Sequence, residues 1–162
     1  MTDLTGRRAL VSGGTRGIGA AIARHLSQAG ARVVVSARSP GGDDGAAHFI
    51  AADLSTPDGP PHLAAQALDY LGSIDILVDN AASQTLVPAG VLAMTDADWL
   101  ADQAGTDIAT ARERFMATFS IPLGRPGTPD DAAALVTFLV SPSACYLTGT
   151  NHVVDGGLLP TV

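Results

Sequence analysis

Residues 8–29 constrain the fold of this chain more than any other segment. Residues 8–13 form a short apolar run that ends in glycine, which is typical of a buried strand. Residues 17–29 follow with apolar side chains at helical spacing, and Gly30 stands where glycine ends a helix. Because a glycine-rich turn joins the two, the segment predicts the first half of a parallel βαβ unit.

The same alternation continues along the chain. Further strands are predicted at residues 32–37, 48–52 and 74–78, and two prolines open a predicted helix at residues 60–71. Strands that alternate with helices predict a parallel sheet with right-handed crossovers and helices on both faces.

The second half of the chain is less regular. A helix with an N-cap signature begins at Thr95, and a second helix is predicted over Ile108–Phe119. Thr128 is predicted to cap a third helix at residues 129–140, whose first turn holds Pro129 and two aspartates. Residues 151–154 are predicted to form a last strand.

The loop between the first strand and helix carries Gly13, Gly17 and Gly19. Glycines there let the backbone turn sharply and approach a pyrophosphate, while the helix N-terminus offers free N–H donors. A glycine cluster alone can be a simple turn. Here strand, loop and helix follow one another in the required order, which favours dinucleotide binding.

The positive charge of the chain is concentrated around this loop. Residues 1–38 hold six of the nine arginines and one acid, whereas residues 39–111 hold eleven aspartates and no base. A basic segment in a chain of net charge −7 predicts an anionic ligand there, and accidental patchiness of a solvated surface is the alternative interpretation. The net acidity argues against nucleic acid as a partner.

Composition excludes several other classes of protein. A single cysteine, Cys145, excludes an intrachain disulfide framework, and the four histidines have no metal-ligand spacing, so we expect no metal site. No apolar run reaches the ~18 residues that span a bilayer. The N-terminal segment lacks an apolar signal core, so we expect a cytoplasmic protein without membrane contact.

Several motifs together resemble the short-chain dehydrogenase/reductase family. The family pattern T-G-x-x-x-G-x-G matches residues 12–19 with serine replacing threonine, and its D-[LV] pair matches Asp53-Leu54. The family's N-N-A-G matches residues 79–82 with two departures. Near the C-terminus, residues 122–131 and 146–157 are similar to the family's P-L-G-R and V-D-G-G segments.

The resemblance implies a truncated Rossmann fold. The expected parallel sheet has the order 3-2-1-4, with the final strand at residues 151–154 beside the fourth strand. Residues 1–162 are then one NAD(P)-binding domain. Residues 1–100 form its cofactor-binding half, and residues 101–162 provide a substrate-loop helix, a C-terminal helix and the last strand.

The resemblance also implies which residues bind the dinucleotide. They are Ser12, Gly13, Thr15, Arg16, Gly17, Ile18, Gly19, Arg38, Asp53, Leu54, Asn80, Ala81 and Ala82. An acid after the second strand would bind the 2′-hydroxyl of NAD, but that strand is followed by Arg38, and Arg16 lies in the glycine loop. Guanidinium groups suit a 2′-phosphate, so NADP(H) is expected in preference to NAD(H). The alternative is that Arg38 is an ordinary exposed side chain.

The family's catalytic residues are missing from this chain. The resemblance implies a serine and a Y-x-x-x-K motif, in which lysine lowers the pKa of the tyrosine that acts as general acid/base. This chain has no lysine, and neither Tyr70 nor Tyr146 stands in such a motif. Family members reach about 250 residues, the upper range for one domain, so about 90 residues are absent. The gap falls at residues 100–102.

The sequence therefore assigns no catalytic residue. Ser83, Tyr146 and His152 are candidates for a replacement acid/base site, although a structural role is favoured for each. Cys145 has no identifiable base beside it, which favours a structural residue. Asp79 replaces a family asparagine, and if it is buried we expect it to be protonated or paired.

Three functions remain open. The first is an NADP(H)-binding oxidoreductase that acts on a small carbonyl or alcohol metabolite, through a site that is non-standard or completed by a partner. The second is a catalytically inactive cofactor-binding subunit in a heteromer with a full-length relative. The third is an isomerase, cyclase or dehydratase. Because truncation exposes an apolar edge of a parallel sheet, we expect a homo-oligomer or such a heteromer.

Overall fold

The first strand and helix form as the glycine-rich segment predicts. The computed structural model describes residues 2–41, 47–81 and 105–159. Strand β1 (Arg8–Ser12) leads through the glycine loop into α1 (Gly17–Gln28), and Gly30 then adopts a φ of +96°, which glycine accepts without strain. The chain turns back into β2 (Arg32–Ala37), which lies beside β1 and parallel to it.

The described sheet has four parallel strands in the order β3-β2-β1-β4, which confirms the predicted order 3-2-1-4. Strand β3 (His48–Ala51) lies at one edge and β4 (Ile76–Val78) at the other. Leu10 on β1 stands between Val34 on β2 and Leu77 on β4. All four carboxyl ends therefore point toward the same side of the molecule, where open parallel sheets bind their ligands.

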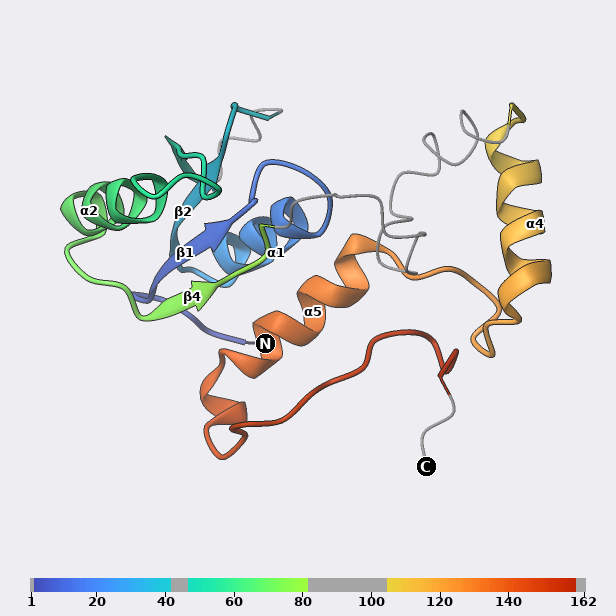
Figure 1. The fold of residues 1–162 in the computed structure, drawn as a ribbon. Coiled ribbons are helices and arrows are strands. Elements are labelled where there is room, and N and C mark those ends of the chain that lie inside the picture. Colours follow the sequence, from blue (N-terminus) through green and yellow to red (C-terminus); the bar gives the residue numbers. More distant parts are fainter. Residues whose placement is uncertain (1, 42–46, 82–104, 160–162) are drawn as a thin grey trace.

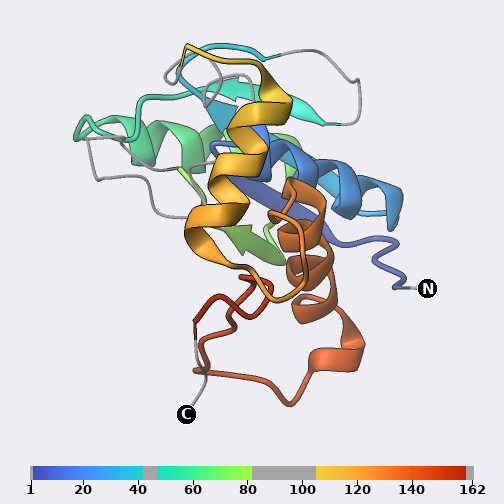
Figure 2. The same cartoon turned by 90° about the vertical axis from the view of Figure 1, so that its right-hand side faces the viewer.

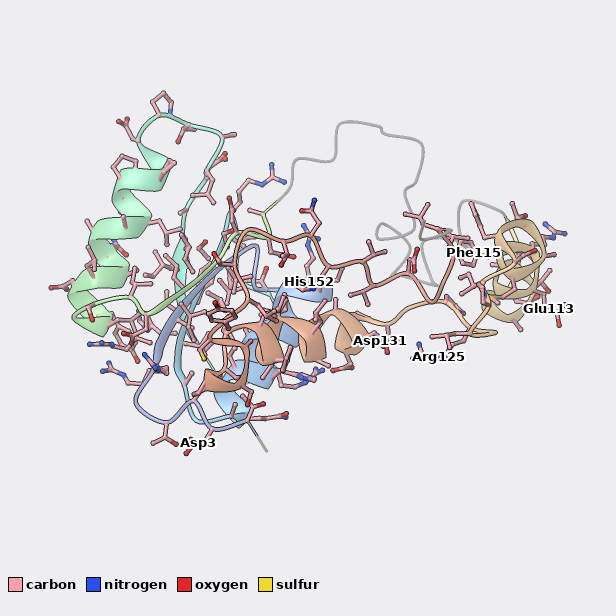
Figure 3. All side chains as sticks on the ribbon, turned by 90° about the horizontal axis from the view of Figure 1, so that it is seen from below. Asp3, Glu113, Phe115, Arg125, Asp131 and His152 are labelled. Carbon is pink, nitrogen blue, oxygen red and sulfur yellow. The ribbon has the colours of Figure 1, made fainter. Side chains whose placement is uncertain are left out.

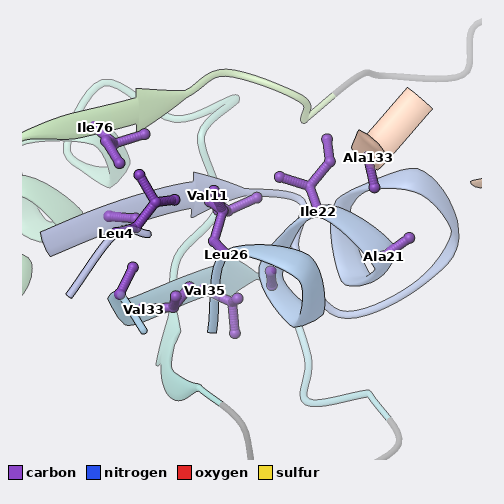
Figure 4. Packing of buried hydrophobic residues seen from close by; sticks show 12 residues of the cluster. Leu4, Val11, Ala21, Ile22, Leu26, Val33, Val35, Ile76 and Ala133 are labelled. Carbon is purple, nitrogen blue, oxygen red and sulfur yellow. The ribbon is translucent and has the colours of Figure 1, made fainter. Parts of the chain in front are cut away.

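Helices cover both faces of this sheet (Figures 1 and 2). Helix α1 and helix α5 (Pro129–Leu139) pack on one face, and α2 (Gly59–Leu71) packs on the other. Figure 4 shows the larger core on the α1 side. It contains residues of β1, β2, β4, α1 and α5, among them Val11, Ile22, Leu26, Val33, Val35, Ile76 and Ala133. The core on the α2 side contains Leu10, Val34, Ile50, Leu63, Ala67 and Leu71.

Helix α5 begins with the predicted cap. The Thr128 hydroxyl accepts from the Asp131 N–H, and the Asp131 carboxylate accepts from the Thr128 N–H, which is a capping box. Asp130 in the same turn binds two side chains of α1, Arg24 and His25, with 2.7 Å to His25 Nε2. These contacts attach the start of α5 to α1 across 105 residues of sequence.

The remaining described elements lie between and after these layers. Helix α4 (Ile108–Phe119) forms over its predicted range, and the Asp107 carboxylate caps it by accepting from the Thr110 N–H at 3.0 Å. In Figure 1 it stands apart from the sheet. A short 3₁₀ turn, η2 (Pro142–Ala144), follows α5. The helix predicted to begin at Thr95 lies outside the described residues.

The predicted final strand beside β4 is corrected by the structure. Residues 151–154 are exposed and form no strand within the described ranges, where β4 is an edge strand. The segment is held elsewhere instead. The Leu123 N–H donates to the Gly156 carbonyl at 3.1 Å, and Gly156 packs against Ile121, so the loop ahead of α5 takes the place of the sheet as its partner.

Candidate functional site

The glycine loop leaves the carboxyl end of β1 with two residues at positive φ. Gly13 has a φ of +64° and Gly17 a φ of +55°, a conformation that side-chain-bearing residues adopt only with strain. Gly14 has no such φ, but a Cβ there would lie 2.6 Å from Val35 Cγ1. Its N–H donates to the Ser36 carbonyl at 3.2 Å, which binds the loop to β2.

Gly19 brings α1 close to the loop. A Cβ at this position would overlap the carbonyl oxygen of Gly13 and would also reach the side-chain amide of Asn80. Helix α1 therefore begins directly against the strand end. Both close approaches leave backbone, rather than side chains, facing the space above the sheet.

The start of α1 has no side-chain cap. Arg16 occupies the N-cap position in an extended conformation without a capping hydrogen bond, and the first turn contains no acidic residue. Within the described ranges, no side chain is recorded as an acceptor for the N–H groups of this turn. Free amides and the positive end of the helix dipole together make this turn an anion-binding position.

Ser12 joins the ends of β1 and β4. Its hydroxyl donates to Asp79 Oδ1 at 2.8 Å and accepts from the N–H groups of Asn80 at 2.9 Å and Ala81 at 3.0 Å. The Asn80 amide donates to the carbonyls of Ser12 and Gly13, both at 3.2 Å. Asp79 is exposed, so the expectation for a buried carboxyl group at this position does not apply.

Asp53 lies just beyond the carboxyl end of β3. Its carboxylate accepts from the Ser55 hydroxyl at 2.7 Å and from the Ser55 N–H at 3.0 Å. These bonds, and more weakly the charge of Arg38, lower the pKa of Asp53. Leu54 packs against the α2-side core, and Gly59 lies so close to the Asp53 carbonyl that a Cβ there would clash.

Arg16 precedes α1 and Arg38 follows β2, so both lie near the carboxyl ends of the strands. Both are exposed, and neither forms an ion pair with a described residue. By contrast, Arg8, Arg24 and Arg125 are paired with Asp75, Asp130 and Asp131. The loop that follows Arg38 contacts the glycine loop, because Gly41 lies against the carbonyl of Thr15. Two unpaired guanidinium groups therefore flank the strand ends.

The described candidates for acid/base chemistry do not converge on one place. Tyr146 is 98% exposed beyond η2, and His152 Nε2 lies 2.8 Å from the Thr150 hydroxyl (Figure 3). Tyr70 lies at the other end of the sheet, where its ring stacks on His48 at 3.9 Å. Ser83 and the expected cofactor residue Ala82 lie outside the described residues.

Other reactive groups form no site in the described part of the chain. Cys145 is exposed. Within the described ranges, no group of three or more His, Cys, Asp or Glu side chains could hold a metal ion. No helix there is long and apolar enough to cross a membrane.

Sequence reasoning missed several of these contacts. The Ser12–Asp79 bond, the contact of Gly41 with Thr15 and the ion pairs of Asp130 join residues that are remote in sequence. The replacement of a family asparagine by Asp79 was the one available signal, and it indicated an altered contact without naming the partner.

Two family models match the chain in succession. A model described as short chain dehydrogenase matches residues 7–101, and one described as Enoyl-(Acyl carrier protein) reductase matches residues 101–159. They meet at position 101, inside the region where the sequence predicted the gap.

Curated relatives show the same relation in length. An uncharacterized oxidoreductase of Mycobacterium tuberculosis is 34% identical to this chain. The alignment covers 78% of this chain and 51% of that protein, so this chain spans about half of the relative's length. An L-rhamnose 1-dehydrogenase (NAD(P)(+)) of Azotobacter vinelandii is 25% identical, with 96% of this chain and 97% of that protein covered. That alignment runs over 251 residues and this chain has 162, so at least 89 aligned positions have no counterpart here.

Solved structures agree with the described fold. A Pseudomonas aeruginosa RhlG/NADP active-site complex is 26% identical with a TM-score of 0.70, over 97% of this chain and 98% of that one. A ligand-free aldohexose dehydrogenase of Thermoplasma acidophilum is 19% identical with a TM-score of 0.81, over 99% and 98%. The second likeness shows the fold alone.

Proposed function

Because this chain belongs to the short-chain dehydrogenase/reductase family, we propose that it binds NADP(H) at the carboxyl edge of its sheet and serves oxidoreduction of a small carbonyl or alcohol metabolite. The observation that carries the proposal is the uncapped first turn of α1 beneath the glycine loop, flanked by Arg16 and Arg38 without ion partners among the described residues.

The glycine cradle fits a pyrophosphate. Side chains at positions 13 and 19 would fill the space next to Asn80, whereas glycine leaves backbone there for close approach. The N–H groups of Gly17, Ile18 and Gly19 would hold phosphate oxygens. When bound, the nicotinamide supplies the hydride acceptor or donor.

The adenosine half would lie across the neighbouring strand ends. Asp53 and Leu54 would border the adenine from β3, while Asn80 and Ala81 border it from β4, with Ala82 following. The hydrogen bonds of Ser12 and Asn80 fix the backbone of that second pair before a ligand arrives. Such preorganisation lowers the ordering cost of binding.

Arg38 would distinguish NADP(H) from NAD(H). A guanidinium beyond β2 favours a 2′-phosphate, and Arg16, the N-cap residue of α1, is a second base available to it. The Pseudomonas aeruginosa structure is an NADP complex, and the Azotobacter vinelandii relative is named for NAD(P)(+). Both support a dinucleotide here without deciding between its two forms.

The proton-transfer step requires a group from outside the described site. The chain contains no lysine. Tyr146 is exposed beyond η2, and Tyr70 stacks on His48, so neither tyrosine is placed at the glycine loop. The proposal is therefore a partner-completed or non-standard site, with Ser83, Tyr146 and His152 as this chain's own candidates. It assigns residues 1–100 to cofactor binding, residues 101–162 to the substrate side, and the whole to the cytoplasm.

The absent lysine also favours a second function. A chain that binds the cofactor without an acid/base pair suits a catalytically inactive subunit that stabilises or regulates a longer relative. Such a subunit binds NADPH and leaves its absorbance unchanged with any carbonyl. A repurposed isomerase, cyclase or dehydratase also leaves that absorbance unchanged but converts its substrate.

Fluorescence titration with NADPH tests the proposal. The Arg38→Ala variant should weaken NADPH binding by about tenfold, the value of one charge-assisted phosphate contact, and should leave NADH binding unchanged. Arg7→Ala is the matched control, because Arg7 is exposed just before β1 at the opposite strand end. Absence of binding at millimolar NADPH would overturn the cofactor assignment, and unchanged affinity in Arg38→Ala would overturn the role of Arg38.

A further inference from the structure

Strand β4 presents a free edge in the described part of the chain. It is hydrogen-bonded on one side, to β1, and has no described strand on the other. Leu77 is 68% exposed, whereas its register partner Leu10, which points to the same face, is 5% exposed beneath α2. An apolar strand with unpaired N–H and C=O groups is a template for another strand.

Residues 151–154 form a second segment without a strand partner in the described part of the chain. They end in two adjacent valines and contain no Asp, Glu, Arg or Lys. Val153 is 59% exposed and Val154 is 37% exposed. Adjacent β-branched residues favour extended backbone, and their exposure leaves apolar area in water that a strand partner would cover.

The chain holds this segment away from its own β4. Beyond it, the Asp155 carboxylate accepts from the N–H groups of Gly157 at 2.8 Å and Leu159 at 2.7 Å, which forms a turn. The Leu123 N–H binds the Gly156 carbonyl and attaches that turn to the loop ahead of α5. In Figures 1 and 2 the segment runs below β4 as drawn.

We propose that a second copy of this chain supplies the missing neighbour of β4, by adding residues 151–154 to that edge. Each copy contains the free edge of β4 and one unpaired segment, so a reciprocal exchange about a two-fold axis pairs both edges with both segments. A partner that offers only an edge, or only a segment, would cover one of the two and leave the other exposed. Neither β4 nor residues 151–154 contain Asp, Glu, Arg or Lys, so the strand pair itself brings no acidic side chains of the two chains together.

The inference rests on the proposed completion of this fold by a partner chain and names that partner as a second copy. Its interface brings the C-terminal segment of one chain to the strand edge next to Asp79 and Asn80 of the other. His152 of one copy would then lie near the cofactor half of its partner and add an imidazole to it.

Light scattering coupled to size exclusion measures the assembly. The unmodified chain should have twice the chain mass, and Leu77→Asp should raise the dimer dissociation constant by about a hundredfold, because each dimer loses two buried leucines. Val153→Asp should act in the same direction. Leu68→Asp is the matched control, since Leu68 is exposed on α2 away from the proposed contact. A monomeric unmodified chain, or a dimer that Leu77→Asp leaves intact, overturns the inference.

Cross-linking tests the strand exchange without destabilising the fold. In a Cys145→Ser background, Leu77→Cys and Val153→Cys chains are mixed and treated with a short bis-maleimide. A heterodimeric product is expected from that pair, and none from Leu68→Cys with Val153→Cys. Failure of the first pair to cross-link contradicts the proposed contact.

NADPH titration of the same samples separates this inference from the proposed function. A dimer with the expected cross-link but no NADPH affinity overturns only the cofactor proposal. A monomer that binds NADPH overturns only the exchange.

Discussion

At position 19 the loop leaves room for no side chain larger than the hydrogen atom of glycine. A methyl group there would overlap the Gly13 carbonyl and press on Asn80, so Gly19→Ala must shift either the loop or α1. We expect a loss of about 1–3 kcal/mol in the free energy of unfolding, as for other overpacked sites. Urea unfolding measures it. Gly127→Ala is the control, because a Cβ at Gly127 meets nothing within 4 Å. Equal stability of the two variants would contradict the close approach.

At the residue scale, the sequence predicted local features of the site but not the contacts between residues that are distant in sequence. The sharp turn at Gly13, Gly17 and Gly19 could be predicted from the order of strand, loop and helix, because positions with a positive φ or a close approach require glycine. The pairing of Ser12 with Asp79 could not be predicted, since it depends on two strands that meet across 67 residues. The place of Arg38 beside Asp53 likewise depends on how β2 and β3 align.

At the scale of elements, local patterns predicted what local chemistry determines. Helix α4 matches its predicted bounds, and α5 begins at the predicted Thr128 cap, because caps and amphipathic spacing act within a few residues. The last strand was the error. Residues 151–154 end in two adjacent valines, but a strand needs a hydrogen-bonding neighbour, and the described chain provides none beside them.

An ion pair between Arg8 on β1 and Asp75, the residue before β4, adds to the backbone pairing of these two strands. The Asp75 carboxylate accepts from Arg8 Nε at 2.7 Å, from Arg8 Nη2 at 2.9 Å and from the Arg8 N–H at 2.9 Å. Arg8 thereby lowers the pKa of Asp75 from 3.8 to about 2. A carboxyl group with a lowered folded-state pKa stabilises the fold above its unfolded pKa, and this contribution is lost as the pH falls from 3.8 toward 2.

Asp75→Asn should therefore reduce stability at neutral pH and should unfold with a smaller further loss between pH 4 and pH 2, the window set by the lowered pKa. Urea midpoints across that range measure the difference from the unmodified chain. Asp69→Asn is the control, because Asp69 is exposed on α2 and forms no ion pair with described residues. If Asp75→Asn and the unmodified chain lost the same amount of stability as the pH falls, the Arg8–Asp75 pair would not stabilise the fold.

For the whole molecule, the decisive feature is a segment of the family that this chain lacks, and the comparisons place the junction at position 101. The missing lysine indicated that the family's acid/base pair is absent, and the two family models meet at position 101 with no segment between them. The sheet order and both helical layers form from local βαβ units, whereas catalysis in the family depends on residues that the missing segment would have carried.

Restoring that segment is the corresponding prediction. The aligned portion of the Azotobacter vinelandii relative, at least 89 positions, would be inserted at position 101. If residues 1–100 already bind the cofactor, the chimaera should oxidise NADPH with a small carbonyl faster than the unmodified chain does, as followed by loss of NADPH absorbance. The family resemblance implies a Y-x-x-x-K tyrosine in the insert; replacing it by phenylalanine is the control and should abolish turnover while retaining NADPH affinity. A folded chimaera that binds NADPH and stays inactive would place the defect in residues 1–100 rather than in the gap.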